Sequence, residues 1–273
     1  MTLSRADITQ LLDSHGLSPS RALGQNFVAD PNTVRRIARL ADVGPGDRVI
    51  EIGAGLGSLT LALAETGAEV VAVEIDRYVL PVLRSLVEPK GVTVVEGDAL
   101  EMAWGEVLGA AEGWVLVANL PYNVATPLVL DLLDDVPAIR RMLVMAQLEA
   151  GQRLAAHVGD PAYGIPSVKV EYWAHADVIG RVPPTVFVPR PRVDSALVRI
   201  VRRDSPATDA DPVRMFALVR AGFGQRRKML RRALTGLVDA AAFEQAGVRP
   251  EARAEELSVA EWGRLATASP APT

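Results

Sequence analysis

The segment Asn119-Leu120-Pro121-Tyr122 combines residue types suited to methylating an amine on a base. The exocyclic amine of adenine is a poor nucleophile because its lone pair is delocalised into the ring. If the Asn119 side-chain oxygen and the backbone carbonyl of Leu120 or Pro121 accept both N–H hydrogens, the nitrogen is drawn towards tetrahedral geometry as it attacks a methyl group. Tyr122 would stack on the extruded base. The segment therefore indicates methyl transfer to an adenine amine, with an ordinary strand-end turn as the alternative.

A glycine-rich turn, Gly53-Ala-Gly55-Leu-Gly57, follows an apolar run, so its backbone can approach a ligand closely. A dinucleotide-binding turn requires glycine or alanine where this chain has Ser58. Glu51 stands just before the turn, where a carboxylate would repel a pyrophosphate but suit a sulfonium ligand that contains an amino acid. The turn thus favours a sulfonium cofactor over a nicotinamide, and a plain tight turn is the alternative.

Two carboxylates end the next two predicted strands along the chain. Glu74 is placed to accept hydrogen bonds from a ribose diol, and Asp98 to accept one from an adenine amine. Either residue taken alone could instead cap a helix. Because the carboxyl ends of parallel strands meet at one edge of a sheet, we expect both to lie beside the Gly53 turn, in a site for an adenosine-containing cofactor.

The composition excludes several kinds of catalysis. The chain has no cysteine, which removes disulfides, thiol nucleophiles and zinc–thiolate sites. Its three histidines, at 15, 157 and 175, are too scattered to suggest a metal site. We therefore expect no metal and no histidine-based chemistry, which agrees with a methyl transfer that needs no general base.

Short β-branched runs alternate with helical patterns, which predicts an α/β fold with a doubly wound, mostly parallel sheet. The predicted strands cover residues 48–52, 69–73, 93–96, 114–118, 141–147, 167–176 and 196–201. The predicted helices between them cover residues 58–66, 77–87, 126–133 and 149–156. Asp30 and Pro31 mark the start of an earlier helix that runs to Leu40.

Turn-rich stretches divide the chain into three predicted parts. Residues 1–47 form a helical N-terminal segment that ends at a Gly-Pro-Gly-Asp turn. Residues 48–203 form the sheet domain, and a polar linker at 204–212 follows it. Residues 204–273 form a small helical domain. Its predicted helices cover residues 213–222, 225–237, 239–246 and 258–266, before a frayed tail at 269–273.

Charge is distributed very unevenly for a chain with a formal net charge of −4. Residues 181–232 hold thirteen Arg or Lys and four Asp, a net charge of +9, so the rest of the chain carries −13. Because the local field sets phosphate attraction, this segment indicates a polyanionic partner, with a solvated charged helix as the alternative. Its densest group, here called the basic cluster, is predicted to occupy mostly one face of the helix over 225–237. The basic cluster consists of Arg226, Arg227, Lys228, Arg231 and Arg232.

Four sequence motifs together resemble the small-subunit ribosomal RNA dimethyladenosine transferases. They are Gly24-Gln-Asn-Phe27, Asn119-Leu-Pro-Tyr-Asn123, Phe187-Val-Pro-Arg-Pro-Arg-Val-Asp-Ser195 and Phe223-Gly-Gln-Arg-Arg-Lys228. The resemblance runs in order from about Arg21 to about Ala266. It implies a Rossmann-like class I methyltransferase that uses S-adenosylmethionine. The implied reaction is N6,N6-dimethylation of two adjacent adenines in a hairpin near the 3′ end of small-subunit (16S) rRNA, in a late assembly particle.

The resemblance also implies roles for individual residues. Those implied to bind the cofactor are Asn26, Val28, Gly53, Glu74, Asp98 and Asn119. Asn119 and Tyr122 would also face the target base, and Phe187 would lie against its other face. The proline-punctuated stretch 183–191 cannot be a central strand, so it is expected to be a rigid surface loop that holds Phe187 in place. The basic cluster would bind rRNA phosphates without sequence preference.

Three other functions are compatible with parts of this pattern. A large-subunit rRNA adenine methyltransferase of the macrolide-resistance type shares the cofactor turn and a similar Asn-x-Pro-Tyr. A non-catalytic RNA-binding assembly factor could keep the fold, although intact Glu74, Asp98, Asn119 and Tyr122 argue against it. A nicotinamide oxidoreductase is disfavoured by Ser58. We further expect a cytoplasmic monomer that binds neither DNA nor membrane, because no signal peptide or long apolar run occurs.

Overall fold

The computed structural model describes residues 2–269, so the predicted tail beyond Ser269 lies outside the described residues. The chain forms two compact units. The sheet unit comprises Met1–Gly151 and Asp177–Arg202, and the helical unit comprises Gln152–Ala176 and Arg203–Thr273.

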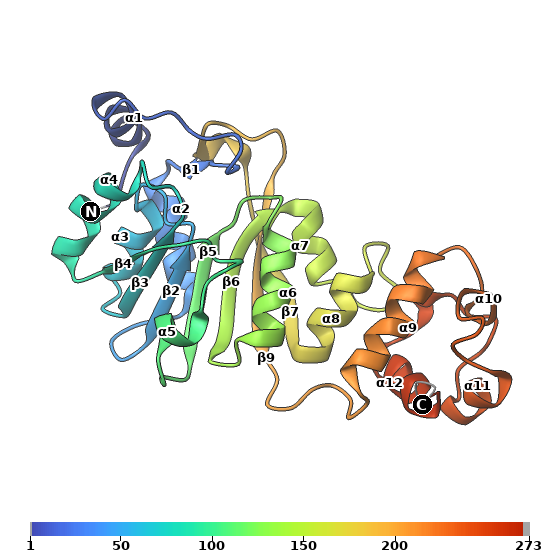
Figure 1. Ribbon diagram of the computed structural model, residues 1–273. Coiled ribbons are helices and arrows are strands. Elements are labelled where there is room, and N and C mark those ends of the chain that lie inside the picture. Colours follow the sequence, from blue (N-terminus) through green and yellow to red (C-terminus); the bar gives the residue numbers. More distant parts are fainter. Residues whose placement is uncertain (1, 270–273) are drawn as a thin grey trace. The chain divides into compact units, whose positions relative to one another are not determined.

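Seven strands form the central sheet in the order β4-β3-β2-β5-β6-β9-β7 (Figure 1). The pairs β2–β3, β3–β4, β2–β5 and β5–β6 are parallel, whereas β9 runs antiparallel to β6. The strands are β2 (Arg48–Ile52), β3 (Glu69–Glu74), β4 (Thr93–Glu96), β5 (Trp114–Asn119), β6 (Ile139–Gln147), β7 (Ala174–Val182) and β9 (Ser195–Arg202). The predicted doubly wound, mostly parallel α/β sheet is confirmed.

The direction in which strands are added reverses between β2 and β5. From β2 the chain adds β3 and then β4 on one side, and it returns to place β5 on the other side of β2. In an open parallel sheet such a reversal leaves a crevice, because the loops after the two strands diverge. Ile52 ends β2 and Asn119 ends β5. The glycine turn and the Asn119 segment therefore begin at the same crevice.

Helices connect the parallel strands, since each parallel crossover needs a long connection. The α-helices of the sheet unit are α1 (Arg5–Ser14), α2 (Pro31–Ala41), α3 (Ser58–Ala64), α4 (Leu80–Val87), α5 (Trp104–Leu108) and α6 (Ala125–Asp135). Two short 3-10 helices, η1 (Glu88–Lys90) and η2 (Pro184–Val186), accompany them, and α7 (Leu148–Leu154) begins in this unit. The α2 helix starts as predicted, because the Asp30 carboxylate accepts a hydrogen bond from Thr33 N at 2.9 Å and Pro31 occupies the first turn.

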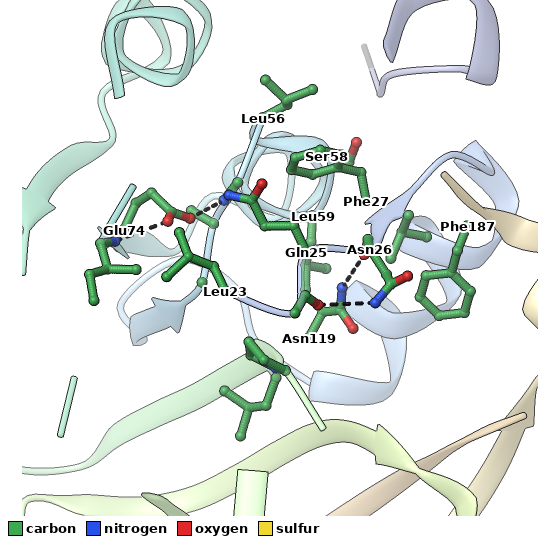
Figure 2. Close-up of a pocket in the computed structure, with 18 of the residues that line it drawn as sticks. Leu23, Gln25, Asn26, Phe27, Leu56, Ser58, Leu59, Glu74, Asn119 and Phe187 are labelled. Atoms are coloured by element: carbon green, nitrogen blue, oxygen red, sulfur yellow. Dashed lines mark hydrogen bonds between the residues drawn. The ribbon is translucent and has the colours of Figure 1, made fainter. Parts of the chain in front are cut away.

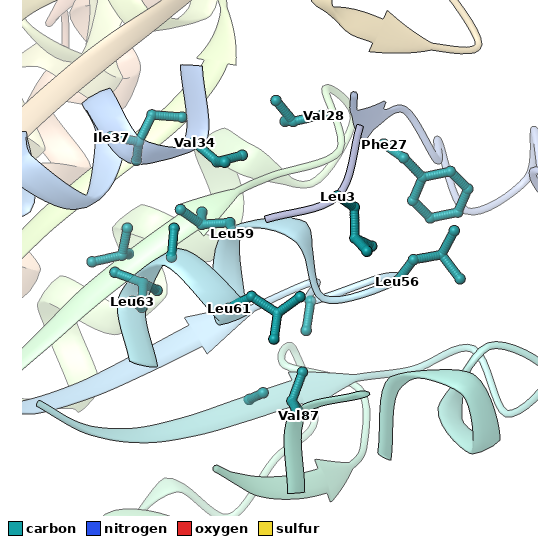
Figure 3. Packing of buried hydrophobic residues seen from close by; sticks show 14 of the residues in the cluster. Leu3, Phe27, Val28, Val34, Ile37, Leu56, Leu59, Leu61, Leu63 and Val87 are labelled. Carbon is teal, nitrogen blue, oxygen red and sulfur yellow. The ribbon is translucent and has the colours of Figure 1, made fainter. Parts of the chain in front are cut away.

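One face of the sheet packs against α2 and α3. Alternate residues of a strand point to opposite faces, so Val49 of β2 reaches this layer whereas Ile50 does not. Figure 3 shows the layer, in which Leu59 of α3 lies near Val34 of α2. Burial of each such side chain stabilises the fold by about 1.5–3 kcal/mol. This packing fixes the position of α3 and hence of the glycine turn that precedes it.

A second, two-stranded sheet joins the N-terminal segment to the proline-rich loop. β1 (Phe27–Val28) pairs antiparallel with β8 (Phe187–Val188), and Val28 lies opposite Phe187. The amide of Ala29 adds a hydrogen bond of 2.7 Å to the carbonyl of Val186. The prolines keep this loop out of the central sheet, as expected from their missing N–H groups. Phe187 is therefore held by backbone pairing as well as by its rigid neighbours.

The helical unit has its own core, which includes Trp262, Tyr163 and Leu218. Its helices are α8 (Ile165–Trp173), α9 (Pro212–Gly224), α10 (Leu230–Ala233), α11 (Ala240–Ala246), η3 (Ala254–Glu256) and α12 (Val259–Ala268). The buried Arg214 donates hydrogen bonds of 2.6 Å to the carbonyls of Leu237 and Ser269, which ties α9 to two later segments. Across residues 2–269, every helix is too short or too polar to span a bilayer.

Residues 167–176 differ from the prediction, because most of the predicted strand is the helix α8. Apolar residues alternate at 168, 170 and 172, which imitates the period of a strand. However, Gly164 and Pro166 favour a helix start, and Val168 and Tyr172, one turn apart, both enter the core of the helical unit. The strand prediction was wrong here, and β7 begins only at Ala174.

The division into units also differs from the predicted boundary at residue 203. The segment Gln152–Ala176 groups with the C-terminal helices. The physical cause is burial: Tyr163 packs in the core of the helical unit, and its hydroxyl donates a 3.0 Å hydrogen bond to the carbonyl of Leu257. The chain thus enters the helical unit once before it completes the sheet.

The predicted helix over 225–237 is not continuous. Residues 225–228 form a turn, and only Leu230–Ala233 is helical. The amides of Leu230 and Arg231 donate to the carbonyls of Ala252 and Pro250 instead of carbonyls one turn earlier. These tertiary hydrogen bonds override the local helical tendency. The basic cluster is therefore divided between a turn and a short helix, and its placement on one helical face was wrong.

Candidate active site

A pocket opens where β2 and β5 end, and it gathers nine of the ten residues predicted for catalysis or cofactor binding. They are Asn26, Val28, Gly53, Glu74, Asn119, Leu120, Pro121, Tyr122 and Phe187. The tenth, Asp98, lines an adjoining pocket, and Gly53 and Pro121 belong to the walls of both. The fold therefore brings together residues that are far apart in the sequence.

The glycine turn forms one wall of the pocket. The amides of Gly53 and Ala54 both donate to the carbonyl of Val73, at 2.9 and 3.2 Å, which holds the turn against β3. Gly55 has φ of 56°, a conformation that disfavours any side chain, and a Cβ there would lie 2.9 Å from the ring of Phe27. Glycine at 55 thus lets β1 cover the turn closely.

Glu74 is buried beside this turn and holds it in place. One carboxylate oxygen accepts a hydrogen bond from Gly55 N at 2.6 Å, and the other accepts from Ile75 N and Asp76 N at 3.0 and 2.8 Å. Burial raises the pKa of Glu74, and the hydrogen bonds from Asp76 and Gly55 oppose that shift. A carboxylate has about four lone-pair positions, so roughly one remains for a ligand hydroxyl.

Glu51 lies under the turn with only 1% of its surface exposed. Within the described residues its Oε2 has no hydrogen-bond partner, and the same holds for Ser58 Oγ and Thr60 Oγ1. Burial raises the pKa of Glu51 to about 8, and the Glu74 carboxylate adds to the rise. At neutral pH the side chain is therefore mostly a neutral acid. Its burial could not be deduced from its position before the turn.

Asn119 is oriented by the N-terminal segment. Its Nδ2 donates a hydrogen bond of 3.0 Å to the carbonyl of Asn26, and the Asn26 side chain donates one of 3.0 Å to the carbonyl of Gly24 (Figure 2). Among residues 2–269, none donates a hydrogen bond to Asn119 Oδ1. The amide nitrogen is thus engaged and the oxygen is available as an acceptor, which is the arrangement needed to bind an N–H group.

Two aromatic side chains complete the pocket wall. Tyr122 is half-buried, and its hydroxyl lies 3.1 Å from the hydroxyl of the fully buried Ser195. Phe187 is 1% exposed and lines the same pocket. Ser195 was recognised only as part of a motif, and its contact with Tyr122 could not be inferred without the fold.

The segment before β1 supplies wall residues that sequence reasoning missed. Leu23 lines both pockets, and Gly24 packs so tightly that a Cβ would lie 3.0 Å from Pro121 Cβ. Gln25 fixes the segment further, because its Nε2 donates to the Asp76 carboxylate at 2.8 Å. The irregular composition of this stretch was visible in the sequence, but its path across the pocket was not.

Asp98 and two apolar side chains shape the adjoining pocket. One Asp98 oxygen accepts a 2.9 Å hydrogen bond from Leu100 N, which leaves the second oxygen for a ligand. Ile75 and Leu100 line this pocket and are 44% and 45% exposed. Exposed aliphatic surface next to a carboxylate suits a flat ring that carries an amine. No group of three or more metal-binding side chains occurs in the part of the chain that the structure describes.

The basic cluster lies in the helical unit and lines neither pocket. All five side chains are exposed. Arg226 makes an ion pair with Glu255 at 2.5 Å, and Arg231 makes one with Glu251 at 3.5 Å. In residues 2–269, Arg227, Lys228 and Arg232 have no ion pair. These three are the members with fully uncompensated charge.

Solved structures share this fold. A dimethyladenosine transferase from Plasmodium falciparum matches with a TM-score of 0.74 at 24% identity, over 86% of this chain and 94% of its own. The 23S rRNA methyltransferase ErmE matches with a TM-score of 0.68 at 26% identity, over 89% and 99% of the two chains. A mostly parallel sheet with a pocket at its strand reversal and a glycine turn after β2 defines the class: this is a class I methyltransferase fold.

The particular family follows from the sequence comparisons. A family model described as ribosomal RNA adenine dimethylase matches residues 17–269. A ribosomal RNA small subunit methyltransferase A from Kineococcus radiotolerans is 48% identical over 278 residues, which cover 98% of this chain and 92% of the relative. The chain belongs to the ribosomal RNA adenine dimethylase family.

Proposed function

We propose that this protein transfers methyl groups from S-adenosylmethionine to N6 of two adjacent adenines in the 3′-terminal hairpin of small-subunit (16S) rRNA. The observation that carries the proposal is the orientation of Asn119. Its amide nitrogen is held by Asn26, and its free oxygen lies in a pocket walled by Tyr122 and Phe187. A flat base fits between aromatic rings, and a free acceptor beside it suits an exocyclic amine.

Each group at this end of the pocket has one task in the reaction. Asn119 Oδ1 and the carbonyl of Leu120 or Pro121 accept the two hydrogens of the amine, which makes its lone pair available. Tyr122 and Phe187 hold the base flat, and Ser195 keeps the Tyr122 ring in position through its hydroxyl. Removal of one preorganised oxyanion-hole donor typically costs about 10²- to 10³-fold in kcat, and we expect a preorganised acceptor here to contribute on the same order.

The residues around the glycine turn fit a sulfonium cofactor. S-adenosylmethionine supplies an electrophilic methyl group on a positively charged sulfur. Glu74 offers its remaining lone pair to a ribose hydroxyl, and Asp98 accepts from the adenine amine between Ile75 and Leu100. Asn26, Val28 and Gly53 would line the methionine end. The absence of a side chain at Gly53 lets the ligand approach the backbone.

The small ribosomal subunit is favoured over the large one by the similarity of relatives. The chain is 48% identical to a relative whose name specifies the small subunit, over nearly its full length. Its identity to the structure named as a 23S rRNA methyltransferase is 26%. A cytoplasmic monomer acting on a late small-subunit assembly particle is the form in which we expect this activity.

One experiment tests the whole proposal. The protein is incubated with methyl-labelled S-adenosylmethionine and with unmethylated small or large ribosomal subunits, and the modified adenines are mapped by mass spectrometry. We expect label on two adjacent adenines of small-subunit rRNA only. Label in large-subunit rRNA would support the rival enzyme, and calorimetry without any cofactor binding would support a non-catalytic assembly factor.

Replacement of Glu74 by Ala is expected to weaken cofactor binding by at least tenfold. The variant loses the ribose contact and also leaves three backbone N–H groups of the turn without their acceptor. Isothermal titration with S-adenosylmethionine measures the effect. The exposed Glu106, replaced by Ala, serves as the control. Unaltered cofactor affinity in the Glu74 variant would remove this residue from the ribose role.

The triple replacement of Arg226, Arg227 and Lys228 by Ala is expected to weaken RNA binding and to flatten its salt dependence. Each lost phosphate contact should reduce the slope of log K against log salt by about 0.7 to 0.9. Because Arg226 is already paired with Glu255, the loss should be nearer two contacts than three. Affinities measured by filter binding between 50 and 200 mM salt would test this, and an unchanged slope would exclude these residues as phosphate contacts.

A further inference from the structure

We infer that the loop of residues 189–194 binds the RNA backbone beside the target adenosine, through phosphate contacts of Arg190 and Arg192. This inference rests on the proposed function and extends it, because it adds a phosphate site in the sheet unit to the basic cluster of the helical unit. The site and the cluster belong to different units.

Both ends of the loop are next to residues of the pocket lined by Asn119, Tyr122 and Phe187, here called the base pocket. Before the loop, Phe187 lines the pocket and pairs with Val28. After the loop, Ser195 contacts the hydroxyl of Tyr122, which lines the same pocket. A base held between Phe187 and Tyr122 would therefore have its sugar and phosphates close to residues 189–194.

The loop is held firmly at each end. Arg5 donates hydrogen bonds of 2.6 and 3.2 Å to the carbonyls of Thr185 and Phe187. At the other end Arg181 makes an ion pair with Asp194, and the carbonyl of Asp194 accepts a 3.0 Å hydrogen bond from Leu148 N. Pro189 and Pro191 restrict the backbone between these anchors. A loop that is already ordered loses little conformational entropy when it binds a ligand.

Arg190 and Arg192 carry charge that the protein leaves uncompensated. Both are exposed, and within residues 2–269 neither makes an ion pair or a side-chain hydrogen bond. The one acidic residue of the loop, Asp194, is taken by Arg181. By contrast, Arg199 on the adjacent strand β9 is paired with Asp177 at 3.2 Å. The two loop arginines are thus free to bind an anion.

The charges of the pocket identify the kind of anion. Glu74 lies in the wall of this pocket and Asp98 in that of the adjoining pocket, so the interior would repel a free anion, whereas the exposed Arg190 and Arg192 would attract one. A nucleotide within an RNA strand suits both the pocket and the arginines, because its uncharged base enters the pocket and its phosphates stay outside beside Arg190 and Arg192. Arginine matches phosphate geometry with paired hydrogen bonds. RNA backbone is therefore the occupant that fits.

The test compares the double variant Arg190→Gln and Arg192→Gln with the wild type. The probe is a fluorescently labelled RNA hairpin with two adjacent loop adenines, and affinity is measured between 50 and 200 mM salt. We expect the affinity of the wild type to depend more steeply on salt. The slope of log K against log salt should be smaller in the variant by about 1.4, which corresponds to two single-strand phosphate contacts. Arg39→Gln, an exposed position on α2, is the matched control and should leave the slope unchanged.

Two further measurements separate the possible outcomes. Cofactor affinity and melting temperature should be equal in the variant and the wild type, which excludes a folding defect as the cause. An unchanged salt slope for hairpin binding would overturn the inference. It would also be overturned if the variant bound the intact small subunit more weakly but bound the hairpin normally, because that result would assign the arginines to a protein contact. If the wild type binds the hairpin but methylates no ribosomal particle, the proposed function fails, while the slope still decides whether the loop binds phosphate.

Discussion

Replacement of Asn119 by Ala is expected to lower kcat for methyl transfer by at least about 10²- to 10³-fold, while RNA affinity changes less than twofold. The truncation removes the Asn119 Oδ1 acceptor, to which no residue in 2–269 donates a hydrogen bond. It does not touch the basic cluster or Arg190 and Arg192, to which we assign the proposed phosphate contacts. Single-turnover transfer from labelled S-adenosylmethionine, measured beside RNA binding, separates the two effects.

Asn119→Asp provides a sharper comparison than Ala alone. It keeps an acceptor oxygen but cannot donate to the carbonyl of Asn26, so the orientation of the side chain is lost. We expect activity well below that of the wild type, which would show that orientation matters as well as the oxygen. Asn32→Ala, an exposed change on α2, is the control. Equal losses of RNA binding and transfer in Asn119→Ala would refute the assigned role.

The sheet and the pocket could be predicted because local patterns agree with the tertiary structure there. β-branched runs form buried parallel strands, and polar residues at their carboxyl ends must meet at one edge. That Glu74, Asp98 and Asn119 line neighbouring pockets could therefore be predicted from their positions at strand ends. The reversal between β2 and β5 then determines which strand ends are neighbours.

The errors arose where tertiary contacts outweigh local pattern. Apolar and polar residues alternate over 168–172 as in a strand. The burial of Val168 and Tyr172 on one side of a helix nevertheless stabilises the helical conformation more than this local pattern favours a strand. Residues 225–237 have helical composition, yet the amides of Leu230 and Arg231 bond to a distant segment. Neither partner can be identified from the local sequence. The same limitation concealed the contact between Ser195 and Tyr122.

Replacement of Glu51 by Gln is expected to stabilise the protein increasingly as pH rises. The folded pKa is about 8 and the ordinary value is 4.5, because burial disfavours the charged form. Below pH 4.5 both states keep the proton and the effect is constant. Between these values the unfolded chain ionises while the folded protein stays protonated, so wild-type stability falls relative to the variant by about 1.4 kcal/mol per pH unit. Above about pH 8 the difference becomes constant again, at roughly 5 kcal/mol.

Denaturant unfolding of both proteins at pH 5, 6, 7, 8 and 9 measures this difference directly. Gln has the shape of the neutral acid, so the comparison isolates ionisation from packing, and Glu106→Gln on the exposed surface of α5 is the matched control. A stability difference independent of pH would contradict a neutral Glu51.

The same unfolding series in the presence of S-adenosylmethionine tests whether Glu51 responds to the cofactor's charge. A positive charge bound over the glycine turn favours the ionised acid, so the ligand should stabilise the wild type more than the variant at pH 7 to 8. Equal stabilisation of the two proteins would show that Glu51 does not respond to the cofactor's charge.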